Sequence, residues 1–383
     1  MGEAEDFIVY CDEAGNSGGR YLDLAQPVFA LSGIILPPGT RDRVVQLVED
    51  VISRNMLPKQ LRPSELKSKD LLKHARGTRN LLQFLEELLG LGVLPTYVVA
   101  DKRYSVAGKL VETFFDPDHN PAASWLGTAD NIERPKLAVE FSGYPPPLLK
   151  AFADWYLEPT MDGVLPVLDG LIAEAERRGD QRLTETLRQQ RAAPSRMVDA
   201  ELQGDMTPGG RSIAISINLP SFQSMVQMVD ELLALNGRRG RIIHDETRTF
   251  EPALQHWYET MAKAQVAEVR GILSDGRPIR FGLRALAGFS ISSYKVDLAL
   301  GAADYVAGLV AAIGKMGLGR QYEGATYLLE ARAQLVPMLF RGMAYALASP
   351  EFIQKFCGPV QDNMAILDRV RERRMAASAA RRR

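Results

Sequence analysis

Four acidic residues stand where predicted strands or helices begin or end, and their type suits divalent-metal chemistry. Asp12 ends the first apolar strand, and Asp245 ends a later one. Glu65 precedes a predicted helix, and Asp304 lies within the last core helix. A carboxylate beside a buried sheet needs a cation or strong hydrogen-bond partners. Such oxygen ligands suit Mg²⁺ or Mn²⁺, and two ions about 3.5–4 Å apart can stabilise the attacking and leaving oxygens of phosphodiester cleavage.

Each of these residues also has an ordinary structural interpretation. Asp12 can begin a turn, because Asp ahead of Gly, Asn and Ser is common turn chemistry. Asp245 can cap the following helix, and Glu65 can be a first-turn charge. Asp304 is harder to explain in this way, because its neighbours in the range 301–307 are mostly small and apolar, and a bare carboxylate is costly there. Spacing alone leaves open whether the four side chains meet.

Glu13 and His244 are further candidate catalytic residues beside this acidic set. Strand alternation points Glu13 to the face opposite Asp12, so the two cannot share a metal unless the strand bulges. Glu13 would then pair with a base or cap the next turn. His244 neighbours Asp245 and can shuttle a proton, although a structural histidine fits the same pattern.

Lysines near the acidic residues are candidates for substrate binding. Lys67 closely follows Glu65, and Lys102 lies in an Asp-Lys-Arg run that ends a predicted strand. Contacts from such residues would position a phosphate backbone without reading its sequence. Further cations occur at positions 69 and 73 and in the range 238–241. Charge runs are also common on solvated faces, so this alternative remains open.

Apolar periodicity predicts an α/β core with one large insertion. Strand-like runs occupy 7–13, 28–36, 93–100, 241–245 and 279–286, and helical spacing occurs at 41–54, 81–89 and 295–313. This order favours a mixed sheet flanked by helices. We predict a core formed by 1–103 and 236–368, a mostly helical insertion at 104–235, and a basic flexible tail at 369–383.

The composition excludes several classes of protein. Cys11 and Cys357 are the only cysteines, which excludes a disulfide framework and a cysteine-rich zinc site. No run reaches the about 18 apolar residues of a membrane helix, and the acidic start lacks the apolar region of a signal peptide. We therefore expect a reduced, cytoplasmic protein. The net charge of −1 gives no global basic field, which is unusual for a pure DNA-binding module but allows a nuclease whose acidic site offsets a basic groove.

Four short motifs resemble, in order, those of the family named domain of unknown function 3800. The run YCDEAG at 10–15, followed by the apolar run FALSGII at 29–35, resembles the family's opening. The runs SELK at 64–67, IIHDE at 242–246 and ADYVAG at 303–308 resemble its later motifs. The resemblance covers both ends of the chain and leaves the range of about 104–235 uncovered. It implies an RNase H-like fold and a metal-dependent nuclease, with Asp12, Glu65, Asp245 and Asp304 as ligands of Mg²⁺ or Mn²⁺.

Two departures from the family pattern concern packing more than ligands. Ala14 stands where the family usually has Ser, which removes a hydroxyl group but no ligand. Gly301 and Ala302 stand where members often carry Leu and Gln. The expected function is cleavage of DNA or RNA by a two-metal mechanism. The alternatives are a nucleotide-directed phosphohydrolase, and a non-catalytic or partner-activated module that binds nucleic acid, or binds protein through the insertion.

Overall fold

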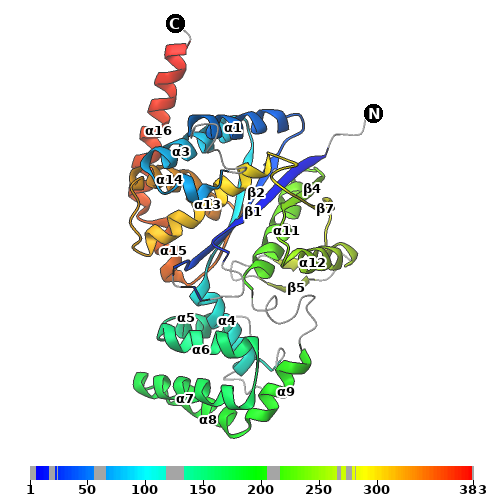
Figure 1. Ribbon diagram of the computed structural model, residues 1–383, viewed down its shortest axis with the longest axis vertical. Coiled ribbons are helices and arrows are strands. Elements are labelled where there is room, and N and C mark those ends of the chain that lie inside the picture. The colour runs from blue at the N-terminus through cyan, green and yellow to red at the C-terminus, as the bar shows by residue number, and fades with distance from the viewer. Residues whose placement is uncertain are drawn as a thin grey trace.

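A six-stranded mixed sheet crosses the middle of the molecule (Figure 1). The computed structural model describes residues 6–16, 22–23, 25–55, 66–117, 133–204, 216–264, 269–272, 278–280 and 282–381. The strand order is β7-β4-β1-β2-β3-β8, with β1 antiparallel to β2, β2 antiparallel to β3, and β4, β7 and β8 each parallel to their inner neighbour. The strands are β1 (Phe7–Ala14), β2 (Val28–Leu36), β3 (Leu94–Asp101), β4 (Gly240–Asp245), β7 (Leu286–Ser292) and β8 (Ala344–Leu347). The α/β class and the mixed sheet flanked by helices are therefore confirmed.

Helices cover both faces of this sheet, which explains why every residue of β2 is buried. One face carries α1 (Arg41–Arg54), α2 (Ser68–Leu71), α3 (Ala75–Gly90), α13 (Leu300–Gly317), α14 (Ala325–Phe340) and α15 (Pro350–Cys357). The other face carries α11 (Asn218–Leu235) and α12 (Glu251–Lys263). A separate two-stranded sheet pairs β5 (Val269–Ile272) with β6 (Pro278–Arg280).

The described residues between positions 102 and 204, which are 102–117 and 133–204, form a helical region with its own apolar cluster, seen below the sheet in Figure 1. Its helices are α4 (Lys102–Phe115), α5 (Glu133–Ser142), α6 (Pro146–Leu157), α7 (Met161–Arg178), α8 (Gln181–Ala192) and α9 (Pro194–Gly204). Helix α11 also lies within the range 104–235 that was predicted as an insertion, but it packs on the sheet through Phe222, Met225 and Val229. Its apolar face covers the strands, so α11 is part of the layered core.

Two sequence-based boundaries differ from the structure. The strand expected at 279–286 divides into β6, which belongs to the small sheet, and β7, which is the edge strand of the large one. Edge strands are only partly buried, and β7 has a weak apolar signal for this reason. Within the range predicted as a basic flexible tail, residues 369–381 continue helix α16 (Val360–Arg381), since their Arg, Glu and Ala residues have high helix propensity. Among the described residues, no helix is long and apolar enough to cross a membrane.

Candidate functional site

Strand pairing brings Asp12 and Asp245 to the same edge of the sheet. β1 and β4 are parallel neighbours, with Cys11 opposite His244, so the next residue on each strand points to the same face. Asp12 is 5% exposed, and Asp245 is 9% exposed. Two carboxylates are thereby held side by side beneath the helices that cover this face.

Helix α13 supplies the third carboxylate. It packs across β1 and β2, where the hydroxyl of Ser32 donates to the carbonyl of Ala303 at 2.7 Å. The next residue, Asp304, is 5% exposed and accepts two hydrogen bonds from Ser68: one from the backbone amide at 2.6 Å and one from the hydroxyl at 3.1 Å. The sequence indicated that burying the Asp304 carboxylate is energetically costly. The two hydrogen bonds from Ser68, the first residue of α2, offset this cost.

Two glycines permit close approaches around this site. A Cβ at Gly308 would lie 2.3 Å from Ser68, so only glycine lets α2 reach Asp304. Gly15 has a φ of +83°, and a Cβ there would lie 2.1 Å from the carbonyl of Val28. The chain can therefore turn directly after the acidic end of β1.

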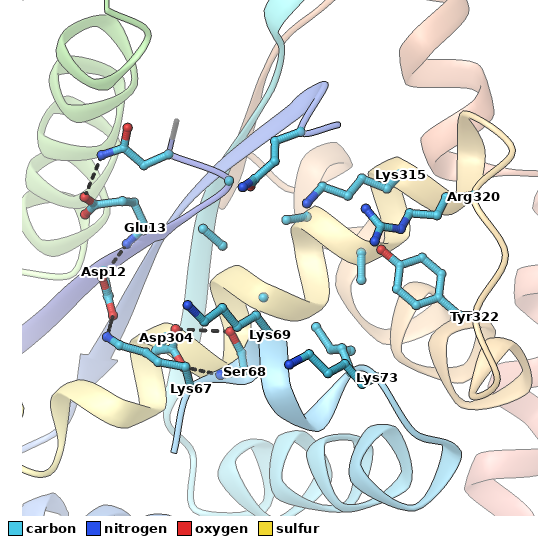
Figure 2. Close-up of a pocket in the computed structure, with 18 of the residues that line it drawn as sticks. Asp12, Glu13, Lys67, Ser68, Lys69, Lys73, Asp304, Lys315, Arg320 and Tyr322 are labelled. Atoms are coloured by element: carbon cyan, nitrogen blue, oxygen red, sulfur yellow. Dashed lines mark hydrogen bonds and ion pairs between the residues drawn. The ribbon is translucent and has the colours of Figure 1, made fainter. Parts of the chain in front are cut away.

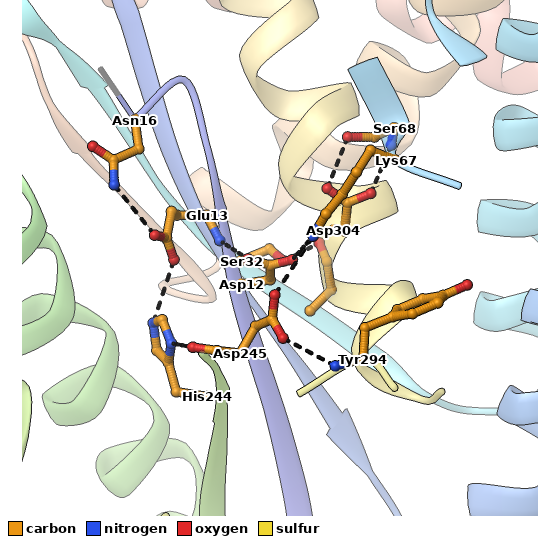
Figure 3. Close-up of polar contacts among 11 residues, drawn as sticks. Asp12, Glu13, Asn16, Ser32, Lys67, Ser68, His244, Asp245, Tyr294 and Asp304 are labelled. Carbon is orange, nitrogen blue, oxygen red and sulfur yellow. Dashed lines mark hydrogen bonds and ion pairs between the residues drawn. The ribbon is translucent and has the colours of Figure 1, made fainter. Parts of the chain in front are cut away.

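The ammonium group of Lys67 lies between two of the carboxylates, as Figure 3 shows. Its Nζ is 3.7 Å from Asp12 Oδ2 and 3.5 Å from Asp245 Oδ2. Asp245 also accepts from the backbone amide of Tyr294 at 3.2 Å, and Asp12 accepts from the amide of Glu13 at 2.7 Å. Lys67, predicted to contact substrate, is thus the internal counter-ion of the acidic cluster.

The electrostatics of Asp12 reflect this crowding of negative charge. Burial is the largest cause that raises the pKa of the Asp12 carboxyl well above its usual range, followed by the nearby charges of Asp304 and Glu13. Lys67 acts in the opposite direction and lowers this pKa. A cation held here would therefore favour the ionised carboxylate.

Glu13 and His244 face the other side of the sheet, as strand alternation requires. His244 is 2% exposed, its Nδ1 lies 2.8 Å from the carbonyl of Asp245, and its ring packs edge-on against Phe222 of α11. Its Nε2 is 3.8 Å from Glu13 Oε2, and Glu13 also accepts from Asn16 at 3.4 Å. His244 is part of this second cluster and does not line the cavity of the three aspartates. Glu13 is nevertheless among the residues that line this cavity, although its carboxylate contacts His244 and Asn16.

A cavity of about 900 Å³ opens beside the three aspartates (Figure 2). Asp12 and Asp304 lie at one end, whereas Lys315 of α13 and Arg320 of the α13–α14 connection lie at the other. Small or apolar residues also line the cavity, namely Leu72, Gly308, Ala311 and Ala312. The basic and aromatic lining residues are Lys67, Lys69, Lys73, Lys315, Arg320 and Tyr322.

Two further predicted residues, Glu65 and Lys102, remain to be placed. Glu65 lies outside the described residues. Lys102 is 4% exposed at the start of α4, and its Nζ donates to the carbonyl of Gly15 at 2.7 Å. Burial lowers the pKa of Lys102 to about 8. Lys102 therefore supports the turn after β1 instead of facing substrate.

The three aspartates are chemically suited to bind Mg²⁺ or Mn²⁺, but the Lys67 ammonium lies between two of them. Asp12, Asp245 and Asp304 offer hard oxygen ligands at one cavity wall. Within the described part of the chain, no three His, Cys, Asp or Glu side chains are grouped closely enough to hold a metal ion. An ion at this position would take the place of the Lys67 ammonium between Asp12 and Asp245. The ligands fit by type, and the fit requires this lysine to move.

Sequence reasoning missed Ser68 and the basic far end of the cavity. The sequence around Ser68 gave no indication that this residue binds Asp304, because serine is common at the start of a short helix. Lys315 had a usable signal: Asp304, Gly308 and Lys315 are spaced along one face of α13.

Three comparisons of the chain with known proteins gave no match. No family model matches it, and no match was found among the curated proteins or the solved structures. The resemblance to the domain of unknown function 3800 family therefore depends on the four motifs alone. The geometry of the site carries the functional argument.

Proposed function

We propose that this protein is a metal-dependent nuclease that cleaves phosphodiester bonds of DNA or RNA. The observation that carries the proposal is the convergence of Asp12, Asp245 and Asp304, from three separate elements, at one end of a cavity lined by cations. Burying a carboxylate is energetically costly unless a cation or a hydrogen-bond donor interacts with it. A polyanionic substrate would bring its phosphates to the cations and its scissile bond to the carboxylates.

The strand order supports an RNase H-like core as part of the same proposal. Strands β1, β2 and β3 form an antiparallel meander, and β4 and β7 run parallel to β1 on its other side. This is the arrangement expected of an RNase H-like sheet, with the first carboxylate on its central strand. The strand β8 and the helical region at 102–204 would be additions to that core.

The chain's own residues have distinct roles in this proposal. Asp12, Asp245 and Asp304 would hold the metal, which would supply Lewis acidity and an activated water when bound. Ser68 orients Asp304 through two hydrogen bonds. Lys67 balances the carboxylates before the metal enters, and its ammonium is then available to a phosphate oxygen. The β1 turn at Gly15 shapes the adjacent wall.

Cleavage of labelled nucleic acids tests the proposal. Single- and double-stranded DNA and RNA are incubated with the full-length protein in Mg²⁺, in Mn²⁺ or in EDTA. We expect metal-dependent cleavage of at least one probe. Asp12→Asn and Asp304→Asn should slow cleavage at least about a hundredfold. Mutation of residues that only support a metal ligand already lowers metal affinity or activity about 10–100-fold. The control Asp154→Asn removes an exposed carboxylate on α6 and should leave the rate unchanged. Undiminished cleavage by Asp12→Asn would overturn the mechanism.

A second candidate function is a non-catalytic or partner-activated module of the same fold. The position of Lys67 favours it, because the ammonium already neutralises Asp12 and Asp245 without any metal. Calorimetric titration of Mg²⁺ or Mn²⁺ into the wild type and Asp245→Asn separates the two functions. Binding that is lost in the variant supports the nuclease, and a wild type that binds neither ion supports the module.

A further inference from the structure

The cavity extends well beyond the three aspartates, along one face of α13. Asp304, Gly308, Ala311, Ala312 and Lys315 all line it from this one helix. At 1.5 Å per residue, the eleven steps from Asp304 to Lys315 correspond to about 16 Å along the helix axis. A ligand that reaches from one end to the other therefore exceeds a single phosphate group.

The far end of the cavity gathers positive charge. Lys315 and Arg320 both line it, and Figure 2 shows their side chains beside Tyr322, away from the aspartates. The Arg320 guanidinium lies 5.7 Å from the centre of the Tyr322 ring and 3.5 Å from the carbonyl of Ala25. Lys315 is partly buried, and among the described residues its ammonium has no hydrogen-bond or ion-pair partner.

The neighbouring positive charges of Lys315 and Arg320 repel each other, so an anion bound at this end of the cavity would be stabilised. Burial is the largest cause that lowers the pKa of Lys315, and the charge of Arg320 lowers it further, while Asp23 acts in the opposite direction. Burial is likewise the largest cause that lowers the pKa of Lys102, on which the nearby charges of Asp23 and Lys315 act in opposite directions. The acidic lining residue nearby, Glu323, is engaged elsewhere: its Oε2 is 3.7 Å from His74 Nδ1 and 3.4 Å from the amide of Ala75.

We propose that Lys315 and Arg320 form a subsite for the terminal phosphate of a nucleic-acid strand whose backbone passes the three aspartates. This inference rests on the proposed nuclease function and names the part of the substrate that is recognised. A terminal phosphate carries about −1.5 to −2 charges at pH 7, whereas an internal phosphodiester carries one. Two adjacent cations match the terminal group better. The subsite makes the protein specific for strand ends.

Binding without divalent metal tests the subsite separately from cleavage. Short single-stranded DNA and RNA oligonucleotides with an internal fluorophore are prepared in three forms: 5′-phosphate, 3′-phosphate and hydroxyl at both ends. Fluorescence anisotropy with the full-length protein in EDTA gives each Kd. We expect one phosphorylated form to bind about tenfold more tightly than the hydroxyl form, a modest value for charge-assisted hydrogen bonds at a partly exposed site. The form that is preferred identifies the strand end.

Charge-removing and charge-conserving variants distinguish the subsite from general electrostatics. Lys315→Gln and Arg320→Gln should each reduce the preference for the phosphorylated form, and the double variant should abolish it. Lys315→Arg should retain most of it, which also shows that the cavity tolerates substitution. Lys263→Gln, on the exposed face of α12, is the matched control and should keep the full preference.

The outcomes separate failure of the subsite from failure of the nuclease. Equal binding of all three forms in both the DNA and RNA series overturns the subsite, as does a preference that survives the double variant Lys315→Gln/Arg320→Gln. Metal-dependent cleavage combined with equal binding overturns the subsite alone. A preference for a terminal phosphate without cleavage in Mg²⁺ or Mn²⁺ supports the subsite and counts against the nuclease.

Discussion

Replacing Lys67 by Met tests the idea that this ammonium occupies the position of a metal ion. Its Nζ lies 3.5 and 3.7 Å from carboxylate oxygens of Asp245 and Asp12. At an effective dielectric constant of about 20, each attraction is about 4.5 kcal/mol before desolvation is counted. The Lys67 side chain is 31% exposed, so the net loss should be smaller than the about 3–5 kcal/mol of a fully buried pair. We expect the metal-free variant to lose about 2 kcal/mol of unfolding free energy.

The same substitution should strengthen metal binding. In the wild type, a divalent ion must displace the Lys67 ammonium, which costs free energy. In Lys67→Met this cost is absent, so the ion should bind more tightly. About 2 kcal/mol corresponds to a decrease of roughly 30-fold in the Kd for Mg²⁺ or Mn²⁺. Calorimetric titration measures this Kd. Thermal unfolding in EDTA and in excess Mg²⁺ provides a second measure, because an ion that binds only the folded state raises its stability.

Two control variants define the interpretation of this experiment. Lys67→Arg keeps the charge and should keep the wild-type metal affinity within a few-fold. Lys263→Met removes an exposed lysine of α12 and should change neither stability nor metal binding. A Lys67→Met variant that binds Mg²⁺ and Mn²⁺ no more tightly than the wild type does would refute the reasoning.

Three further substitutions test the supports of the site. Gly308→Ala should lower the unfolding free energy in urea by about 1–3 kcal/mol, because its Cβ would lie 2.3 Å from Ser68; an unchanged value would contradict the close approach of α2. Tyr10→Phe should lower it by about 1–2 kcal/mol, since the Tyr10 hydroxyl donates to Asp297 at 2.7 Å ahead of α13; a change of less than about 0.5 kcal/mol would show that this bond is dispensable. Lys102 has a folded-state pKa lowered to about 8 from 10.5, so the unfolded chain binds the extra proton between these values. Wild-type stability relative to Lys102→Met should therefore rise from pH 8 to pH 10.5 and stay flat below pH 8, as measured by urea unfolding at each pH.

Strand periodicity predicted the part of the site that depends on local geometry. Asp12 lies near the end of β1 and Asp245 ends β4, and alternation alone separates Asp12 from Glu13. Asp304 was identified because its apolar helical neighbours make a carboxylate expensive. These inferences need only the sequence within a few residues of each position. The parallel pairing of β1 with β4 then brings Asp12 and Asp245 together.

Long-range partners could not be predicted from the sequence. Lys67 and Ser68 are adjacent in the chain, yet one contacts the carboxylates of β1 and β4 and the other contacts Asp304 of α13. Nothing in their local pattern separates these roles. Helix α11 was assigned to the insertion for a similar reason, because an apolar helical face does not reveal which surface covers it.

The separation of charge within the cavity explains why the net charge of −1 gave no indication of the polyanionic ligand that we propose. Acidic and basic lining residues occur in similar numbers and nearly cancel in the sum. Helix α13 nevertheless places Asp304 and Lys315 about 16 Å apart, so a ligand meets opposite charges at the two ends. A polyanion is repelled by the negative charge that remains on the aspartates and is attracted by Lys315 and Arg320. Neutralisation of the acidic end, by Lys67 or by a divalent ion, is therefore required before a strand can occupy the whole cavity.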